Sequence, residues 1–246
     1  MLPWGQTPEL LPRNDPFPPF PFSAVLFDCD GVLVDSEPIT NRVLADMLGE
    51  LGWQLTAEES MNIFTGKAVK DETALIEAKT GFKITDDWLR GFRARRNEAL
   101  DRDLVAIPHA PAAIREIHAR LKGRIACASG ADRHKVELQL AKVGLLDCFE
   151  GRIFSGHEMP RSKPHPDVYL AAAEALGVDP KRCAVVEDTV TGAMAGVAAG
   201  ATVFGYSTGE SGHSGPGALR AAGAVAVFSD MTGLPALLAG YGLQAA

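Results

Sequence analysis

The chain has 246 residues, which is enough to bury a full core as one large domain or as a main domain with a smaller companion. Hydrophobic residues at 46% and charged residues at 22% are ordinary values for a globular protein and name no function. The net charge of −7 argues against a nucleic-acid-binding surface, but it is compatible with a small anionic substrate.

The first 22 residues are rich in proline, and we expect an extended or disordered tail there because closely spaced prolines prevent a regular helix. This stretch lacks the basic start and apolar centre of a signal peptide. No segment of the chain approaches the roughly 20 apolar residues of a membrane span. The cysteines stand singly, which predicts reduced thiols and a cytoplasmic protein. We expect no membrane or nucleic-acid partner, and a monomer or weak homodimer.

Short apolar runs recur along the chain, each followed by polar residues or glycine and then by a helical pattern. Because these runs are continuous rather than alternating, they predict strands covered on both faces, as in a parallel sheet. The predicted strands are 24–27, 125–128, 152–154, 184–186, 202–206 and 224–228, with helices at 133–143, 166–176 and 190–199. This alternation predicts a doubly wound, Rossmann-like α/β fold.

The region between the first two predicted strands carries only helical signals. Ser36 precedes one helix, which we expect it to cap, and Thr56 with Glu59 forms a capping-box pattern before another. Further helices are predicted at 70–79 and 86–100. So much helix exceeds an ordinary crossover between strands. The sequence therefore predicts a helical cap domain, residues 37–108, inserted into a core domain of residues 23–36 and 109–246.

The first predicted strand ends in two aspartates, Asp28 and Asp30, which are followed by Gly31. In open α/β sheets ligands bind at this end of the strands, and a glycine lets the chain turn close to a ligand. One carboxylate can attack phosphorus and form an acyl-phosphate, while a second protonates the leaving oxygen and later deprotonates water. The alternative is an acidic turn, and the pair alone does not decide between the two.

Two further strand ends carry groups that suit a phosphate. Ser129 and Gly130 follow the second strand just before a helix, where a hydroxyl and free backbone N–H groups can bind an anion. Lys163 follows the third strand and precedes Pro164, which keeps it out of a helix and on a loop. Each signal alone is weak, because a serine here is usually a helix cap and a loop lysine is usually solvated.

The fourth strand ends in Glu187 and Asp188, and adjacent acids after an apolar strand are costly unless they bind something. Magnesium prefers oxygen ligands, so one or two carboxylates and a phosphate suffice to hold it. The combination decides the interpretation. Four successive strands supply a nucleophile, an acid/base, oxyanion donors, a cation and metal ligands, which is the set that phosphoryl transfer needs.

These motifs, in this order, resemble the haloacid-dehalogenase superfamily, in the group whose helical cap follows the first motif. That group includes phosphoglycolate phosphatases, β-phosphoglucomutases and bacterial sugar-phosphate phosphatases. The resemblance covers nearly everything from Ser23 onward. It implies that Asp28 is the nucleophile and that Asp30 is the acid/base, both facing a Mg²⁺ ion, Asp30 through its backbone carbonyl.

The same resemblance implies that Ser129 and Lys163 hold the transferring phosphoryl group. It implies that Asp188 binds Mg²⁺ directly, with Glu187 assisting directly or through water. Dehalogenases and phosphonate-cleaving members lack an acid at the position of Asp30, so its presence favours phosphate esters. The expected function is hydrolysis of a small phosphorylated metabolite, such as a sugar phosphate or a phospho-sugar acid. The alternatives are a phosphomutase of the β-phosphoglucomutase type and a non-catalytic protein on the same fold.

The cap offers fewer signals about the substrate. Lys67 lies in a segment that resembles the family's cap loop, and it is the predicted substrate contact, although a surface role is equally consistent with the pattern. A run of arginines could meet a second anionic group, but such a run is more often a solvated helix face. It comprises Arg90, Arg93, Arg95 and Arg96.

Overall fold

The computed structural model describes residues 20–65, 67–209 and 215–242, so the predicted proline-rich tail lies almost entirely outside the described residues. Its centre is a six-stranded sheet of order β3-β2-β1-β4-β5-β6, in which every neighbouring pair is parallel. The strands are β1 Ala24–Phe27, β2 Ile125–Ser129, β3 Ile153–Ser155, β4 Cys183–Glu187, β5 Thr202–Tyr206 and β6 Ala226–Phe228. The doubly wound α/β fold is thereby confirmed.

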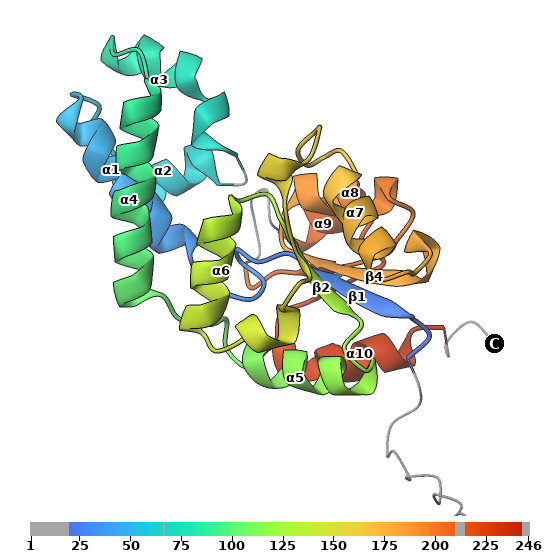
Figure 1. Cartoon of the computed structure of the whole chain (residues 1–246). Helices are drawn as coiled ribbons and strands as arrows, with labels where there is room; N and C mark the ends of the chain where they lie inside the picture. Colours follow the sequence, from blue (N-terminus) through green and yellow to red (C-terminus); the bar gives the residue numbers. More distant parts are fainter. Residues whose placement is uncertain (1–19, 66, 210–214, 243–246) are drawn as a thin grey trace, which may run out of the picture.

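Helices cover both faces of the sheet (Figure 1). One face carries α5 (Ala110–Arg120), α6 (Arg133–Lys142) and α10 (Leu234–Gly240), and the other carries α7 (Asp167–Ala175), α8 (Val190–Ala198) and α9 (Pro216–Ala221). Strand β1 shows why its sequence is continuously apolar. Val25 and Phe27 pack into the first layer, whereas Ala24 and Leu26 pack into the second.

Three of these helices, α5, α9 and α10, have no counterpart among the sequence predictions. Each carries a proline in its first turn, and α9 and α10 have only 6 and 7 residues, too few to show a helical period. Short 3₁₀ turns complete the chain: η1 Val69–Asp71, η2 Leu146–Phe149, η3 Gly156–Glu158, η4 Pro180–Arg182 and η5 Met231–Gly233. No helix in the described ranges combines the length and apolar character needed to cross a bilayer.

The remaining helices form a separate lobe, at the upper left of Figure 1. They are α1 Glu37–Glu50, α2 Ala57–Phe64, α3 Thr73–Thr80 and α4 Asp86–Asp103. They enclose their own apolar cluster, which includes Leu48, Ile76 and Phe92. Thr56 and Glu59 form the predicted capping box, with each side chain accepting from the other residue's backbone N–H at 3.1 and 2.8 Å.

The two chain segments that join the lobe to the core lie side by side. Val34 and Ala106 form an antiparallel bridge, the N–H of Asp35 donates to the carbonyl of Val105, and that of Ile107 donates to Leu33. The lobe therefore stands on a paired stem next to the end of β1. Because all strands run parallel, their carboxyl ends meet at one edge of the sheet, where side chains that follow different strands can converge.

Candidate active site

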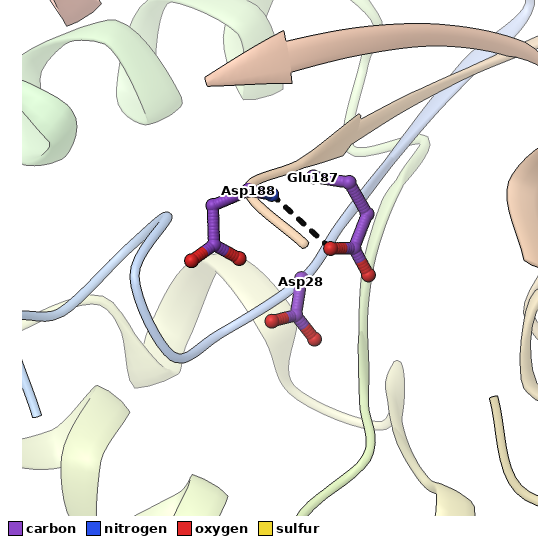
Figure 2. A group of neighbouring side chains, drawn as sticks. All are labelled: Asp28, Glu187 and Asp188. Carbon is purple, nitrogen blue, oxygen red and sulfur yellow. Dashed lines mark hydrogen bonds between the residues drawn. The ribbon is translucent and has the colours of Figure 1, made fainter. Parts of the chain in front are cut away.

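Three carboxylates meet where β1 and β4, neighbours in the sheet, come to an end. Asp28 follows β1, and Glu187 and Asp188 close β4; each offers an oxygen within 4.8 Å of the others (Figure 2). The N–H of Asp28 donates to the carbonyl of Val186, which fixes the two strand ends together. One oxygen of Asp188, Oδ1, is buried and has no hydrogen-bond partner. A buried oxygen without a donor is costly, and a cation would satisfy it.

Gly31 makes room for this cluster. Its φ of +74° lies in the left-handed region that glycine tolerates, and a Cβ at this position would lie 2.1 Å from Oδ2 of Asp188. Any side chain here would push Asp188 away from Asp28. The glycine that follows the two aspartates is therefore a condition for the acidic cluster, as well as a turn residue.

Lys163 is the cation of the cluster. Its ammonium donates to Asp28 Oδ1 at 2.7 Å, to Glu187 Oε1 at 2.6 Å and to the carbonyl oxygen of Ala128 at 3.0 Å. The hydroxyl of Tyr169, on α7, lies 3.0 Å from the ammonium and itself donates to Glu187 Oε1 at 2.7 Å. One ammonium thus faces three carboxylates, so the site has an excess of negative charge.

Glu187 is held more tightly than a simple metal ligand would be. Besides Lys163 and Tyr169 at Oε1, its Oε2 accepts from the N–H of Asp188 at 3.1 Å and from the N–H and hydroxyl of Thr189 at 3.2 and 3.0 Å. A Cβ on Gly192 would lie 1.8 Å from this carboxylate, so that glycine makes space for it. This geometry suits an anchor for Lys163, and the predicted metal role of Glu187 stays a prediction.

The two aspartates of the first motif have opposite electrostatic environments. Burial raises the pKa of Asp28 to about 7; the Lys163 ammonium opposes this rise, and the carboxylates of Glu187 and Asp30 add to it. Burial also acts to raise the pKa of Asp30. There the Lys135 ammonium and hydrogen bonds prevail, and they lower the pKa to about 2. Asp30 is therefore ionised in this arrangement.

The groups that hold Asp30 come from α6 and from the residue that precedes α1. From α6, Lys135 donates to Oδ2 and Gln139 to Oδ1, both at 2.8 Å, and the hydroxyl of Ser36 also donates to Oδ1. The interpretation of Ser36 as a helix cap is wrong for its side chain, which makes no capping hydrogen bond at the start of α1. A tertiary partner, the Asp30 carboxylate, replaces the backbone amides that a cap would bind.

Ser129 and Gly130 reach the same edge from β2, and both line the cavity that opens over Asp28. The Ser129 hydroxyl accepts from the N–H of Ala131 at 3.1 Å, which shapes the loop before α6. Asp132 then caps α6 by accepting from the N–H of Lys135 at 3.0 Å, as the sequence predicts. The structure thus brings the predicted residues of all four strand ends together.

The cavity has a volume of about 390 Å³ and lies between the core and the helical lobe. Asp28, Asp30, Lys163 and Asp188 line it from the core. Lys67 lines it from the lobe; its ammonium lies 3.6 Å from Glu72 Oε2 and is half exposed. Its predicted contact with substrate therefore stays a prediction.

Sequence reasoning missed Lys135, Gln139 and Tyr169. Lys135 and Gln139 are spaced i, i+4 on α6 and both are buried, with Gln139 fully enclosed. A lysine and a glutamine on the apolar face of a helix were a usable signal, because buried polar side chains need partners. Tyr169 gave no such signal, since a tyrosine at the start of a helix fits an ordinary core.

A doubly wound core with carboxylates at its strand edge and a helical lobe above them is typical of hydrolases that act through carboxylates. Within that class, the chain belongs to the haloacid dehalogenase-like hydrolase family, whose profile matches residues 22–200. The family resemblance seen in the sequence motifs is confirmed.

Relatives with known names support this assignment. The 6-phosphogluconate phosphatase of Escherichia coli K12 is 33% identical over 182 residues, covering 74% of this chain and 80% of the relative. Hexitol phosphatase B of the same organism is 31% identical over 181 residues, covering 72% and 79%. A crystal structure of a family hydrolase from Deinococcus radiodurans R1, with bound phosphate and sodium, superimposes with a TM-score of 0.72 at 38% identity, covering 91% of this chain and 97% of that one. The chain is accordingly an enzyme of the phosphatase type.

Proposed function

We propose that this enzyme is a magnesium-dependent phosphatase that hydrolyses the phosphate ester of a small metabolite through an aspartyl-phosphate on Asp28. The observation that carries the proposal is the position of Asp28. It is a buried residue that lines the cavity from the core, and it lies close to both the Lys163 ammonium and Asp188, whose Oδ1 has no partner. A carboxylate that can attack, a fixed ammonium and a buried carboxylate oxygen that lacks a donor thus converge on one point.

Asp28 is poised for attack by the way it is held. Lys163 occupies Oδ1, and no donor among the described residues reaches Oδ2. The free oxygen would form the bond to phosphorus as the bond from phosphorus to the ester oxygen breaks, with the departing alcohol taking a proton. The Lys163 ammonium and the loop of Ser129 and Gly130 would hold the phosphoryl oxygens.

Asp30 is the acid/base in this scheme. Its low pKa makes the arrangement described here the ionised one, suited to deprotonating the water that hydrolyses the aspartyl-phosphate. To protonate the leaving alcohol in the first step, Asp30 must first gain a proton. Binding of an anionic phosphate nearby favours that gain, because negative charge raises the pKa of a carboxyl group.

The residues present fit a divalent cation. The donors are carboxylate oxygens, which Mg²⁺ prefers, one of them is buried without a partner, and the local charge is negative. Asp28 and Asp188 would hold the ion through their side chains. When bound, Mg²⁺ would offset the negative charge on the phosphoryl oxygens.

Replacing Asp28 tests the proposal. Asp28→Asn removes the attacking oxygen charge with little change in shape, and we expect phosphate release from a sugar-phosphate panel to fall at least about 10³-fold. Asp35→Asn is the matched control, because Asp35 is exposed in the same turn. Chelating magnesium should stop the wild-type reaction reversibly. Comparable activity in Asp28→Asn would contradict the mechanism, and the same assay scored for isomerised product would identify a phosphomutase.

A further inference from the structure

A group of basic side chains lines the cavity in addition to the phosphoryl site. Lys70 comes from η1, Arg93 and Arg96 from α4, and His157 from η3 on the core. We call these four residues, three cations and the histidine beside them, the cationic cluster. They come from the helical lobe and from the core, so a molecule that fills the cavity beyond Asp28 contacts them on two sides.

The other two arginines of the run at positions 90–96 are paired away from the cavity. Arg90 pairs with Asp87 one turn earlier on the same helix, and Arg95 pairs with Glu50 at the end of α1. Neither of these arginines lines the cavity. The run of arginines in the sequence therefore divides into two that serve the lobe and two, at positions 93 and 96, that face the cavity.

The cationic cluster has too few counter-charges. Arg96 pairs with Asp132 at 2.9 Å, but Asp132 is also the cap of α6. Lys70 and Arg93 form no hydrogen bond or ion pair with the described residues. Asp71 follows Lys70 in the sequence and also lines the cavity, but its carboxylate pairs with neither Lys70 nor Arg93.

The electrostatic effect of this imbalance is seen at His157. Burial lowers the pKa of its imidazole, and the charges of Lys70, Arg93 and Arg96 lower it further, opposed only by Asp132. Lys70, Arg93 and Arg96, which come from η1 and α4, thus act together on the imidazole. With its pKa lowered, His157 is neutral at pH 7, so the positive charge here is that of the other three residues. Holding like charges together is unfavourable unless an anion binds between them.

We propose that the cationic cluster is a second anion subsite, so that the substrate carries a carboxylate or a second phosphate beyond the ester at Asp28. The proposal rests on the proposed function, which places the ester at Asp28. The substrate class is then a phosphorylated sugar acid or a bisphosphate. A phosphate with a neutral polyol tail would leave Lys70 and Arg93 without a partner.

Other residues that line the cavity suit a hydroxylated carbon chain. Thr40 and Asn41 on α1 and Thr191 on α8 line it with polar groups. The hydroxyl oxygen of Thr40 is buried and has no hydrogen-bond partner. A substrate hydroxyl would satisfy it, because a buried polar atom costs free energy until it is paired.

Two substrates that differ in one group test the proposal: 6-phosphogluconate and sorbitol 6-phosphate, which carry a carboxylate and a hydroxymethyl group at the far end. A hexitol 1,6-bisphosphate forms the third arm and distinguishes a phosphate from a carboxylate. We expect kcat/KM to favour one anionic tail over the neutral one by roughly tenfold to a hundredfold, the range of a charge-assisted hydrogen bond. Equal values for all three would overturn the subsite.

Variants locate the effect. Arg93→Gln should lower kcat/KM for the anionic tail by about tenfold or more and leave the neutral tail within about twofold. Arg95→Gln, the matched control outside the cavity, should change neither. A loss of the same size for both substrates in Arg93→Gln would contradict the proposal, and thermal unfolding checks that the variant folds.

Binding separates this proposal from the proposed function. Calorimetry with Asp28→Asn measures the tail preference without turnover; if that variant is active, the products gluconate and sorbitol, which carry the same two tails, replace the substrates. A preference for the anionic tail there supports the subsite even if Asp28→Asn retains activity and the mechanism fails. No preference in binding overturns the subsite, whatever the catalytic result.

Discussion

The two ends of the cavity are built differently. At the core end, Lys163 has four polar contacts and Glu187 accepts five hydrogen bonds, so each charge is fixed by several neighbours. At the lobe end, Lys70 and Arg93 have no such partner within the described residues. Chemistry needs groups held in place before the substrate arrives, whereas selection of a substrate needs groups whose charge the substrate itself completes.

Replacing the lysine at the core end gives the largest expected effect, and replacing a lysine at the lobe end is its control. Lys163→Met leaves buried carboxylates without their counter-charge, so we expect loss of turnover and a decrease of about 3–5 kcal/mol in the free energy of unfolding. Lys67→Met, the matched control, removes a half-exposed lysine with one contact at 3.6 Å and should cost less than about 1 kcal/mol. Urea unfolding measures both. A similar cost for the two variants would remove the distinction between the ends.

The sequence predicts the core end better than the lobe end, for a physical reason. The positions of Asp28, Lys163 and Asp188 follow from apolar runs that end at one edge of a parallel sheet, and that edge is a property of the topology. Which arginine of α4 faces the cavity depends on how that helix is rotated against its neighbours. A sequence pattern spaced every three or four residues leaves Arg90 and Arg93 equivalent until the packing is known.

The sequence also fails to predict the partner of a side chain that can bind either a local group or a distant one. A serine before a helix normally caps it, and Ser36 occupies that position, yet its hydroxyl contacts Asp30. Lys135 and Gln139 reach the same carboxylate from a helix more than a hundred residues later in the sequence. Local rules cannot rank such long-range contacts, which is why the motif residues are predictable and the groups that orient them are not.

Removing the charge that faces Asp30 should give an intermediate effect with a defined pH dependence. The folded-state pKa of Asp30 is about 2, below the ordinary 3.8, so its ionised form stabilises the fold above pH 4 and this contribution is lost as pH falls toward 2. Lys135→Gln keeps a donor but removes the charge. We expect it to lower the free energy of unfolding by about 1–2 kcal/mol at neutral pH and less as the pH approaches 2.

The control for that prediction is Lys142→Gln, because Lys142 is an exposed lysine at the end of the same helix. It should change the free energy of unfolding by less than about 0.5 kcal/mol across the same pH range. Denaturant titrations between pH 2.5 and 7 measure both variants. A loss in Lys135→Gln that is the same at every pH would show that Lys135 acts through packing alone.

The smallest expected effect tests how firmly the core end must hold its lysine. Tyr169→Phe removes the hydroxyl that donates to Glu187 and lies 3.0 Å from Lys163, and one such hydrogen bond contributes about 1 kcal/mol. We expect kcat to fall several-fold with KM nearly unchanged, because Lys163 keeps its contacts to Asp28 and Glu187 but loses one constraint on its position. Tyr206→Phe is the control, since the Tyr206 hydroxyl makes no hydrogen bond to a described residue. A rise in KM without a change in kcat would mean that Tyr169 acts on substrate binding, and the contrast between the two ends of the cavity would lose its basis at this residue.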